Sequence, residues 1–327
     1  MKIAFYSPHL SLGGTEITLY DFADYNEKLL GNESVIIYNK GNNANHPSVI
    51  QKFQTRFSDI FTLNSPEENW TWNSRITVPL LDEVIASQNC DALYMQKFGN
   101  NDGVVSRICK TLVLCAAPVC DPHGDVYAYV SEWLSKVASG GRYPAVPSMI
   151  TPLSKDEGNL RKELGIPLSA RVFGRTGGEY GWNLPWADNV VEHVLHSDEN
   201  IYFLFQNTNL SFSHPRALKL EPSADLKIKS QFINTCDAMI HARAEGESFG
   251  CACGEFSSLN KPIITWSLSK DKHHIETLGE KGIYYNNAEE MYEKLINFTP
   301  EPEKNWNCYD QFKPEVIMNT FNKIFLQ

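Results

Sequence analysis

Short apolar runs alternate with helical patterns along the whole chain, and this alternation constrains the fold more than any other feature of the sequence. In the first half, strand-like runs are found at 2–6, 34–38, 92–95, 111–116 and 127–130, and helical patterns at 16–30, 76–88, 103–109 and 132–138. Ser131 is the expected N-cap of the last helix, because its hydroxyl can accept a backbone N–H. Strands that alternate with helices predict a parallel sheet covered by helices on both faces.

The alternation stops in a segment with prolines at positions 144, 147 and 152, and then begins again. Strands are predicted at 171–174, 201–206, 217–220, 238–241, 262–266 and 282–285, and helices at 185–195, 225–234, 250–259, 273–278, 288–298 and 314–325. We therefore predict an α/β protein of two Rossmann-like, doubly wound domains facing a cleft, at residues 1–147 and 148–308, followed by a helical segment at 309–327. Ligands of such folds bind at the carboxyl ends of the strands.

Composition excludes several classes of function. The 327 residues are 42% hydrophobic, enough for two cores, and the net charge of −10 leaves neither half basic. A nucleic-acid partner and tight docking on anionic lipid are not expected, because both need clustered Lys and Arg. No apolar stretch approaches the roughly 20 residues of a membrane span, and the N-terminus lacks a signal-peptide core, so we expect a cytoplasmic protein. The eight cysteines lack paired C-x₂-C spacing, which predicts reduced thiols and no metal site.

Two carboxylates, Glu247 and Glu255, lie eight positions apart in the segment 241–265. Between them, a turn at Phe249 and Gly250 opens a predicted helix. A helix N-terminus presents N–H groups that have no intrahelical acceptor and about half a positive charge, so this turn suits a phosphate group. The two acids can then reach hydroxyl groups on either side of that phosphate. The alternative is a pair of solvated carboxylates at the ends of a helix.

Each half has a glycine-rich turn after its first strand. Gly13 and Gly14 open the first helix, with Thr15 as its expected cap, and this turn either contacts a ligand or is an ordinary strand-to-helix connection. In the second half, Arg175 follows the first strand beside two further glycines. An arginine at that edge can bind a diphosphate through its planar guanidinium, and the alternative is a surface ion pair with Glu179.

These three elements together resemble retaining glycosyltransferases of the GT-B fold, most closely glycosyltransferase family 4. In that family a Glu-Gly-Phe-Gly-type turn leads to a second Glu and then to a Gly-x-Pro-Val-type strand. The matching positions here are Glu247, Phe249, Gly250, Glu255 and Pro262. The resemblance spans nearly the whole chain. It implies that the first domain binds the acceptor, that the second binds the donor, and that the final helix packs back on the first domain.

The resemblance also implies a role for each residue around the turn. Glu247 would contact hydroxyl groups of the donor sugar, and Glu255 would bind the ribose of the donor. The turn at Phe249 and the backbone amides of Gly250 and Cys251 would lie against the diphosphate or the sugar.

Arg175 would neutralise the leaving nucleoside diphosphate, so the resemblance implies a metal-independent enzyme with no cofactor besides its nucleotide-diphosphate-sugar co-substrate. The chain departs from the family pattern at Tyr180, which stands where relatives carry a lysine five residues after the arginine. We hypothesise that Arg243, four residues before Glu247, supplies the missing positive charge.

Other polar residues and one strand end are weaker candidates. His123 lies in a loop after the strand 111–116, where relatives often place a sugar-contacting histidine, and the alternative is an ordinary turn residue. His273 and His274 begin a predicted helix and are expected to be surface or capping residues. Leu220 ends the third strand of the second half, where we expect the nucleobase to lie.

The sequence therefore predicts an enzyme that transfers a sugar from a nucleotide-diphosphate donor to a glycan, lipid-linked or small-molecule acceptor with retention of configuration. Trp70 and Trp72 could stack on a sugar acceptor or cover an apolar edge. A nucleotide-sugar epimerase or hydrolase of the same fold is the alternative enzyme, since a fold does not determine its chemistry. A non-catalytic sugar-nucleotide-binding protein is the third alternative, and the missing lysine is the sequence argument for it.

Overall fold

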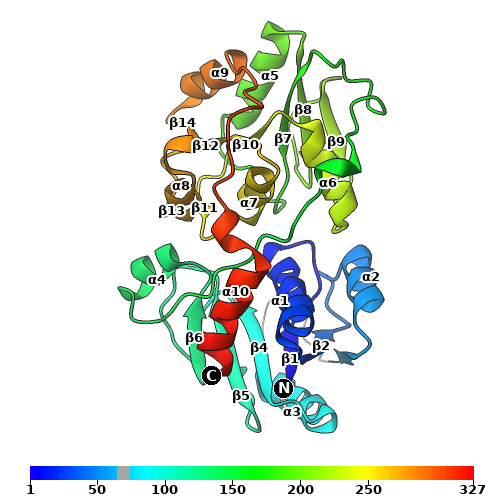
Figure 1. The fold of residues 1–327 in the computed structure, drawn as a ribbon, viewed down its shortest axis with the longest axis vertical. Coiled ribbons are helices and arrows are strands. Elements are labelled where there is room, and N and C mark those ends of the chain that lie inside the picture. Colours follow the sequence, from blue (N-terminus) through cyan, green and yellow to red (C-terminus); the bar gives the residue numbers. More distant parts are fainter. Residues whose placement is uncertain (65–73) are drawn as a thin grey trace. The chain divides into compact units, whose positions relative to one another are not determined.

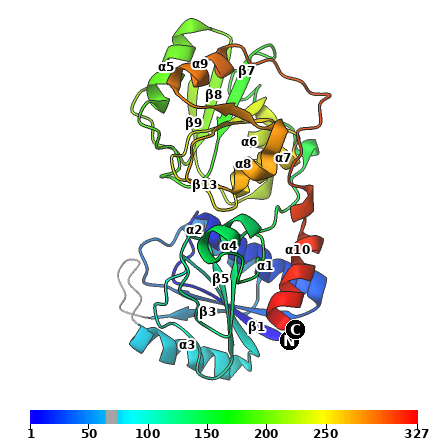
Figure 2. The same cartoon turned by 90° about the vertical axis from the view of Figure 1, so that its left-hand side faces the viewer.

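The structure is a computed structural model that describes residues 1–64 and 74–327, which form two compact units (Figures 1 and 2). Unit 1 comprises Met1–Met149 together with Phe312–Gln327, and unit 2 comprises Ile150–Gln311. The predicted sugar-stacking residues Trp70 and Trp72 lie outside the described residues. Within 1–64 and 74–327, no helix has the length and apolar character needed to cross a bilayer.

Unit 1 contains six parallel strands in the order β3-β2-β1-β4-β5-β6, which is the strand order of a Rossmann fold. The strands are β1 (Lys2–Ser7), β2 (Glu33–Asn39), β3 (Ile60–Leu63), β4 (Ala92–Lys97), β5 (Lys110–Cys115) and β6 (Val126–Tyr129). The helices are α1 (Gly14–Leu30), α2 (Pro47–Arg56), α3 (Ser74–Gln88), α4 (Glu132–Ser139) and α10 (Pro314–Phe321), which continues as a π-helical turn (Asn322–Leu326).

The sheet of unit 1 has a helix layer on each face. Phe5 and Tyr94 are partners in register on β1 and β4. The ring of Tyr94 packs on Phe22 of α1 and on Phe321 of α10, with centroid separations of 5.5 Å in each case. The residues next to these in β1 and β4 place their side chains on the other face of the sheet, where they pack on α3. The aromatic cluster thus explains why α10 lies beside α1 in both views (Figures 1 and 2).

Unit 2 repeats the same strand order, as β14-β12-β10-β7-β8-β9. Its strands are β7 (Arg171–Arg175), β8 (Ile201–Gln206), β9 (Ala217–Leu220), β10 (Ala238–His241), β12 (Ile263–Trp266) and β14 (Ile283–Tyr285). Its helices are α5 (Ala187–Ser197), α6 (Leu226–Thr235), α7 (Cys251–Ser258), α8 (His273–Leu278) and α9 (Ala288–Ile296). Two short strands, β11 (Gly246–Glu247) and β13 (Asp271–Lys272), pair beside the main sheet. The predicted α/β class, with two Rossmann-like domains, is confirmed.

Local predictions had mixed outcomes in unit 1. Ser131 caps α4 as predicted, since its hydroxyl accepts from the N–H of Leu134 at 3.1 Å. The predicted helix at 103–109 is wrong, because the described backbone there is irregular, with bends at 103 and 107–109. Asp102 Oδ1 accepts from the N–H of Val104 at 2.9 Å, and such side-chain acceptors compete with helix formation. Helix α2 and strand β3 were not predicted.

Candidate active site

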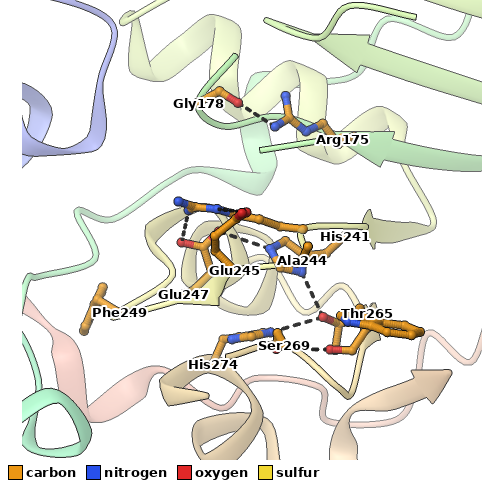
Figure 3. Close-up of polar contacts among 12 residues, drawn as sticks. Arg175, Gly178, His241, Ala244, Glu245, Glu247, Phe249, Thr265, Ser269 and His274 are labelled. Atoms are coloured by element: carbon orange, nitrogen blue, oxygen red, sulfur yellow. Dashed lines mark hydrogen bonds and ion pairs between the residues drawn. The ribbon is translucent and has the colours of Figure 1, made fainter. Parts of the chain in front are cut away.

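Three neighbouring strands of unit 2 carry polar side chains at or near their carboxyl ends. β12, β10 and β7 are adjacent and parallel, so these ends lie at one edge of the sheet. β7 ends at Arg175 and β10 at His241, and Thr265 of β12 is the partner of His241 in register. Figure 3 shows these side chains together with Glu247 of β11. Because ligands of doubly wound sheets bind at this edge, it is the candidate active site.

Arg175 is buried, with an exposed fraction of 3%, and three oxygen atoms hold its guanidinium. Nη1 donates to the carbonyl of Asn207 at 2.8 Å and to Oγ1 of Thr208 at 2.5 Å, and Nη2 donates to the carbonyl of Gly178 at 2.6 Å. Burial lowers the pKa of Arg175 to about 10, so the side chain stays charged at neutral pH. The alternative of a surface ion pair with Glu179 is wrong, because these acceptors hold the guanidinium inside the unit.

Glu247 is held as an ionised carboxylate by two donors. His241 Nε2 lies 3.1 Å from Oε1 (Figure 3), and Arg243 Nη1 lies 3.1 Å from Oε2. Burial acts to raise the pKa of Glu247, but the hydrogen bond from His241 and the charge of Arg243 outweigh it and lower this pKa to about 2. The two described donors use two of the roughly four acceptor positions of a carboxylate, which leaves room for hydroxyl groups of a ligand.

Arg243 and Arg175 both lie beside the backbone of Gly181. A Cβ atom on Gly181 would lie 2.8 Å from Nη2 of Arg175 and 3.7 Å from Cδ of Arg243. The charge of Glu247 raises the pKa of Arg243, so this guanidinium is also charged at neutral pH. Tyr180, the residue before Gly181, is 84% exposed. Two positive charges therefore lie near one loop, and that arrangement suits an anion.

The turn at Gly250 fits glycine alone. Its φ angle is +90°, which is strained for any other residue, and a Cβ atom there would lie 3.2 Å from Cβ of His274 and 3.3 Å from Cβ of Glu247. Gly250 is the N-cap of α7, and Cys251, half-buried, is the first residue of that helix. The close packing fixes the start of α7 directly beside the carboxylate-bearing strand β11.

The two histidines that begin α8 are buried, so the prediction of surface or capping residues is wrong. Their exposed fractions are 7% for His273 and 0% for His274. The ring of His273 stacks on Phe249 with a centroid separation of 5.2 Å, so the Phe249 side chain belongs to the core, and any contact of this residue with a ligand would come from its backbone. Burial lowers the pKa of His273 to about 4 and that of His274 to about 3, which keeps both rings neutral at pH 7.

Glu255 has a partner elsewhere in unit 2, and Leu220 lies at the end of the edge strand β9. Glu255 of α7 forms an ion pair with Lys229 of α6, with 2.6 Å between Oε1 and Nζ. Leu220 ends β9, and the carbonyl of the next residue, Glu221, accepts from Nε2 of Gln206 at 2.7 Å. The contacts of Glu255 and Leu220 with ribose and base stay predictions.

In unit 1, the glycine turn lies against the carboxylate of Glu16. A Cβ atom on Gly13 would lie 2.5 Å from Glu16 Oε2, and the hydroxyls of Ser11 and Thr15 each donate to this carboxylate at 2.9 Å. Gly13 is the N-cap of α1 and the exposed Gly14 is its first residue, so the prediction that Thr15 caps the helix is wrong. A carboxylate at this end of α1 stabilises the helix through its dipole. Ligand contact at the two glycines stays a prediction.

His123 is buried in unit 1 between a backbone carbonyl and a lysine. Nδ1 lies 2.8 Å from the carbonyl oxygen of Asp121, and Nε2 lies 3.2 Å from Nζ of Lys97. Because a carbonyl only accepts, Nδ1 carries the proton and Nε2 accepts from Lys97. Lys97 also donates to Asp102 Oδ1 at 2.5 Å. Both ring nitrogens of His123 thus have protein partners, and its role toward a sugar stays a prediction.

Sequence reasoning missed His241, Thr265 and Lys97. His241 ends a strand predicted at 238–241, so the signal that selected Arg175, a polar residue at the carboxyl end of a parallel strand, applies to it as well. Lys97 lies beyond the predicted strand 92–95, because β4 is two residues longer. Thr265 gave no signal, since threonine is common in strands.

Comparison with known proteins identifies the fold. No protein-family model and no curated protein matches the sequence. The structure of HepE from Anabaena in complex with UDP and glucose matches 99% of this chain and 98% of its own, at 13% identity and a TM-score of 0.71. Sucrose-phosphate synthase from Thermosynechococcus elongatus matches 100% of this chain and 98% of its own, at 11% identity and a TM-score of 0.72.

The chain has the GT-B fold. A protein from Listeria monocytogenes that is assigned as a UDP-N-acetylglucosamine 2-epimerase also matches, over 100% of this chain and 97% of its own, at 13% identity and a TM-score of 0.63. At these identities the likeness is one of fold. Proteins that share the GT-B fold thus differ in chemistry, and function must be argued from the residues at the sheet edge of unit 2.

Proposed function

We propose that this chain is a retaining glycosyltransferase, which transfers a sugar from a nucleotide-diphosphate-sugar to the hydroxyl group of an acceptor. The observation that carries the proposal is the carboxylate of Glu247, which His241 and Arg243 hold ionised at the carboxyl edge of the unit 2 sheet. The GT-B fold supports the proposal, because HepE, a protein of that fold, binds UDP and glucose.

The chemistry of sugar transfer matches the charges at this edge. The bond between C1 of the sugar and the diphosphate oxygen breaks, so C1 becomes positive and the leaving diphosphate negative. The acceptor oxygen bonds to C1, and its proton passes to the departing phosphate oxygen. Glu247 would accept hydrogen bonds from sugar hydroxyls, and its negative charge would favour the positive C1.

Two arginines and the start of α7 are suited to the diphosphate. The protein oxygens around Arg175 fix its planar guanidinium, so little side-chain entropy is lost when it binds a phosphate. Arg243 would supply the second positive charge, which the neutral Tyr180 does not. The backbone amides of Gly250 and Cys251 open α7, whose N-terminus favours an anion. With these charges in place, the proposed reaction proceeds without a metal ion.

The remaining roles rest on the same proposal. Glu255, beside Lys229, would bind the ribose, and the strand end at Leu220 would lie beside the base. In unit 1, the turn at Gly13 and Gly14, together with the loop of His123, would contact the transferred sugar or the acceptor. The acceptor would be a hydroxyl group of a glycan, a lipid-linked sugar or a small molecule.

Donor turnover tests the proposal. The protein is incubated with UDP-glucose and a panel of other nucleotide sugars, with acceptor glycans, and both nucleotide release and glycosylated product are measured. NMR coupling constants of the product report whether the anomeric configuration is retained.

Glu247→Gln should lower kcat by roughly 10²-fold or more, because the variant lacks the negative charge. Glu245→Gln is the matched control, since the Glu245 side chain is 52% exposed, accepts a hydrogen bond from Asn183 and lies 3.9 Å from Nε of Arg243, at the limit of an ion pair. We expect this control to stay within about threefold of the wild type, as is usual for an exposed group. Equal activity of the wild type and Glu247→Gln would contradict the assignment of Glu247, and no turnover of any donor would contradict the function.

An epimerase is the second candidate, because the Listeria protein assigned to that activity shares the fold with a TM-score of 0.63. An epimerase would convert UDP-N-acetylglucosamine without any acceptor, whereas a transferase needs the acceptor for product formation. Incubation of this donor alone, followed by NMR, separates the two. Tight binding of donors in calorimetry, with no turnover under either condition, would instead indicate a binding protein.

A further inference from the structure

Behind Glu247 lies a chain of three buried polar side chains from three elements of unit 2. The Thr265 hydroxyl lies 2.9 Å from Nδ1 of His241 and 3.2 Å from Nε2 of His274, and the other ring nitrogen of His241 contacts the Glu247 carboxylate (Figure 3). The exposed fractions are 5% for His241 and 0% for both Thr265 and His274. Among residues 1–64 and 74–327, these side-chain hydrogen bonds thus form an unbranched path from α8 through β12 and β10 to β11.

The chemistry of each group determines which atom donates the proton in each hydrogen bond of this path. A carboxylate only accepts, so Nε2 of His241 must carry a proton toward Glu247. A neutral imidazole has one N–H, so Nδ1 of His241 accepts from the hydroxyl of Thr265. That hydroxyl has a single proton, and it must therefore accept from Nε2–H of His274.

The arrangement in which these donors and acceptors are exchanged is disfavoured, because Nδ1 of His274 is buried and has no hydrogen-bond partner among the described residues. If His241 were doubly protonated, its Nδ1–H would donate to Thr265. The hydroxyl could then donate to Nε2 of His274, which would leave the proton of His274 on Nδ1 as a buried N–H without an acceptor among the described residues. Or the hydroxyl could accept from both rings, which would leave its own proton without an acceptor among these residues. Orphaned buried N–H groups are rarer than unsatisfied acceptors, so the path with Nε2–H on both rings is favoured.

We infer that His241 is a positioning residue for Glu247, and that Thr265, which accepts from His274, holds the His241 ring in place by donating to Nδ1, while Glu247 keeps the proton on Nε2. With Nδ1 of His241 committed to Thr265, the ring cannot turn its bare nitrogen toward the carboxylate. Glu247 therefore keeps one orientation, with Oε1 on His241 and Oε2 on Arg243, and presents its remaining lone pairs in fixed directions. The effect on catalysis rests on the proposed function, whereas the assignment of the tautomers does not.

Histidine ring spectra test the inference without any substrate. In protein labelled with ¹⁵N-histidine, long-range ¹H–¹⁵N spectra at neutral pH should show His241 and His274 as neutral Nε2–H tautomers, with assignments from His241→Gln and His274→Gln. Thr265→Val removes the hydroxyl at nearly constant shape, and the ¹⁵N signal of Nδ1 of His241 should then shift, because this nitrogen loses its hydrogen-bond donor while Glu247 still holds the proton on Nε2. Thr265→Ser should restore the wild-type pattern. An Nδ1–H or cationic His241 in the wild type, or unchanged spectra in Thr265→Val, would overturn the inference.

Kinetics test the consequence for Glu247. Thr265→Val should lower kcat for sugar transfer by about tenfold, as for other residues that orient a catalytic group, with an unchanged Kd for UDP. Thr265→Ser should recover most of the loss. A loss of UDP binding equal to the loss of kcat would instead indicate general damage to the site and count against a positioning role. A wild-type protein that turns over no donor would refute the proposed function, and the spectra would then decide the inference alone.

Discussion

Glu247→Gln removes the carboxylate that unit 2 holds ionised, and it should change how the stability of the protein depends on pH. The pKa of Glu247 is lowered from 4.5 to about 2, because the hydrogen bond from His241 and the charge of Arg243 outweigh the opposing effect of burial. On acidification the unfolded chain therefore takes up this proton before the folded chain does. The carboxylate stabilises the folded protein above about pH 4.5, and this contribution is lost as the pH falls toward 2.

The magnitude follows from the difference between the two pKa values. A shift from 4.5 to about 2 corresponds to about 3 kcal/mol of stabilisation by the ionised form. Between pH 6 and pH 3, about 2 kcal/mol of it should be lost, because at pH 3 the unfolded carboxyl is almost fully protonated while the folded one is still mostly ionised. The side chain of Glu247 is 23% exposed, so water screens part of this effect and about 2 kcal/mol is an upper bound.

Urea unfolding of the wild type, Glu247→Gln and Glu245→Gln at a series of pH values measures the effect. Trp182, Trp186 and Trp266 pack against the core of unit 2, so tryptophan fluorescence follows the unfolding of this unit, together with a contribution from Trp133 in unit 1. The fall in unfolding free energy between pH 6 and pH 3 should be up to about 2 kcal/mol larger in the wild type than in Glu247→Gln. Glu245→Gln should depart less from the wild type than Glu247→Gln does, because water screens this 52% exposed carboxylate, although the hydrogen bond from Asn183 lowers its pKa as well. Parallel curves for the wild type and Glu247→Gln would refute the reasoning.

Three further predictions concern single side chains. Gly250→Ala should destabilise unit 2 by about 1–3 kcal/mol in urea unfolding, because φ is +90° there; a change below about 0.5 kcal/mol would contradict the geometry. Phe321→Ala should cost about 3–5 kcal/mol, because the ring is fully buried and lies 5.1 Å from the ring of Phe22; an unchanged Tm would exclude this packing. Lys97→Met should raise the pKa of His123, since the charge of Lys97 adds to burial in lowering it; an NMR titration of the ring measures the change, and an unchanged pKa would disprove the contact.

The six strands of the main sheet of unit 2 were predictable because each is a short run bounded by turn residues, whereas the two-residue strands β11 and β13 were not predicted. The runs predicted at 201–206, 217–220 and 238–241 match β8, β9 and β10 residue for residue. Central strands of a parallel sheet are buried on both faces, so the sequence shows them as continuous apolar runs. The order of the elements then follows from the chain, because crossover connections between parallel strands have one preferred hand.

Unit 1 was harder to predict where the deciding partner lies far away in the sequence. The segment 103–109 has apolar residues at helical spacing, yet Asp82 of α3 accepts from the hydroxyl of Ser106 at 2.8 Å and from Nε of Arg107 at 3.0 Å. These bonds across 24 and 25 positions stabilise an irregular backbone in place of a helix. Conversely, α2 buries only Val49 and Phe53, so its apolar face was too narrow to indicate a helix.

Buried polar residues are the part of a site that is hardest to predict from a single sequence. Arg175 could be found from its place at the end of a strand, but His274 could not, because its partner Thr265 belongs to another element. A polar group buried without a partner costs free energy, so the hydrogen bonds among His241, Thr265 and His274 stabilise unit 2 while they orient Glu247. Most substitutions in this path should therefore reduce stability and activity together. Thr265→Ser is the exception, since it keeps the hydroxyl and both partners, and its comparison with Thr265→Val separates orientation from stability.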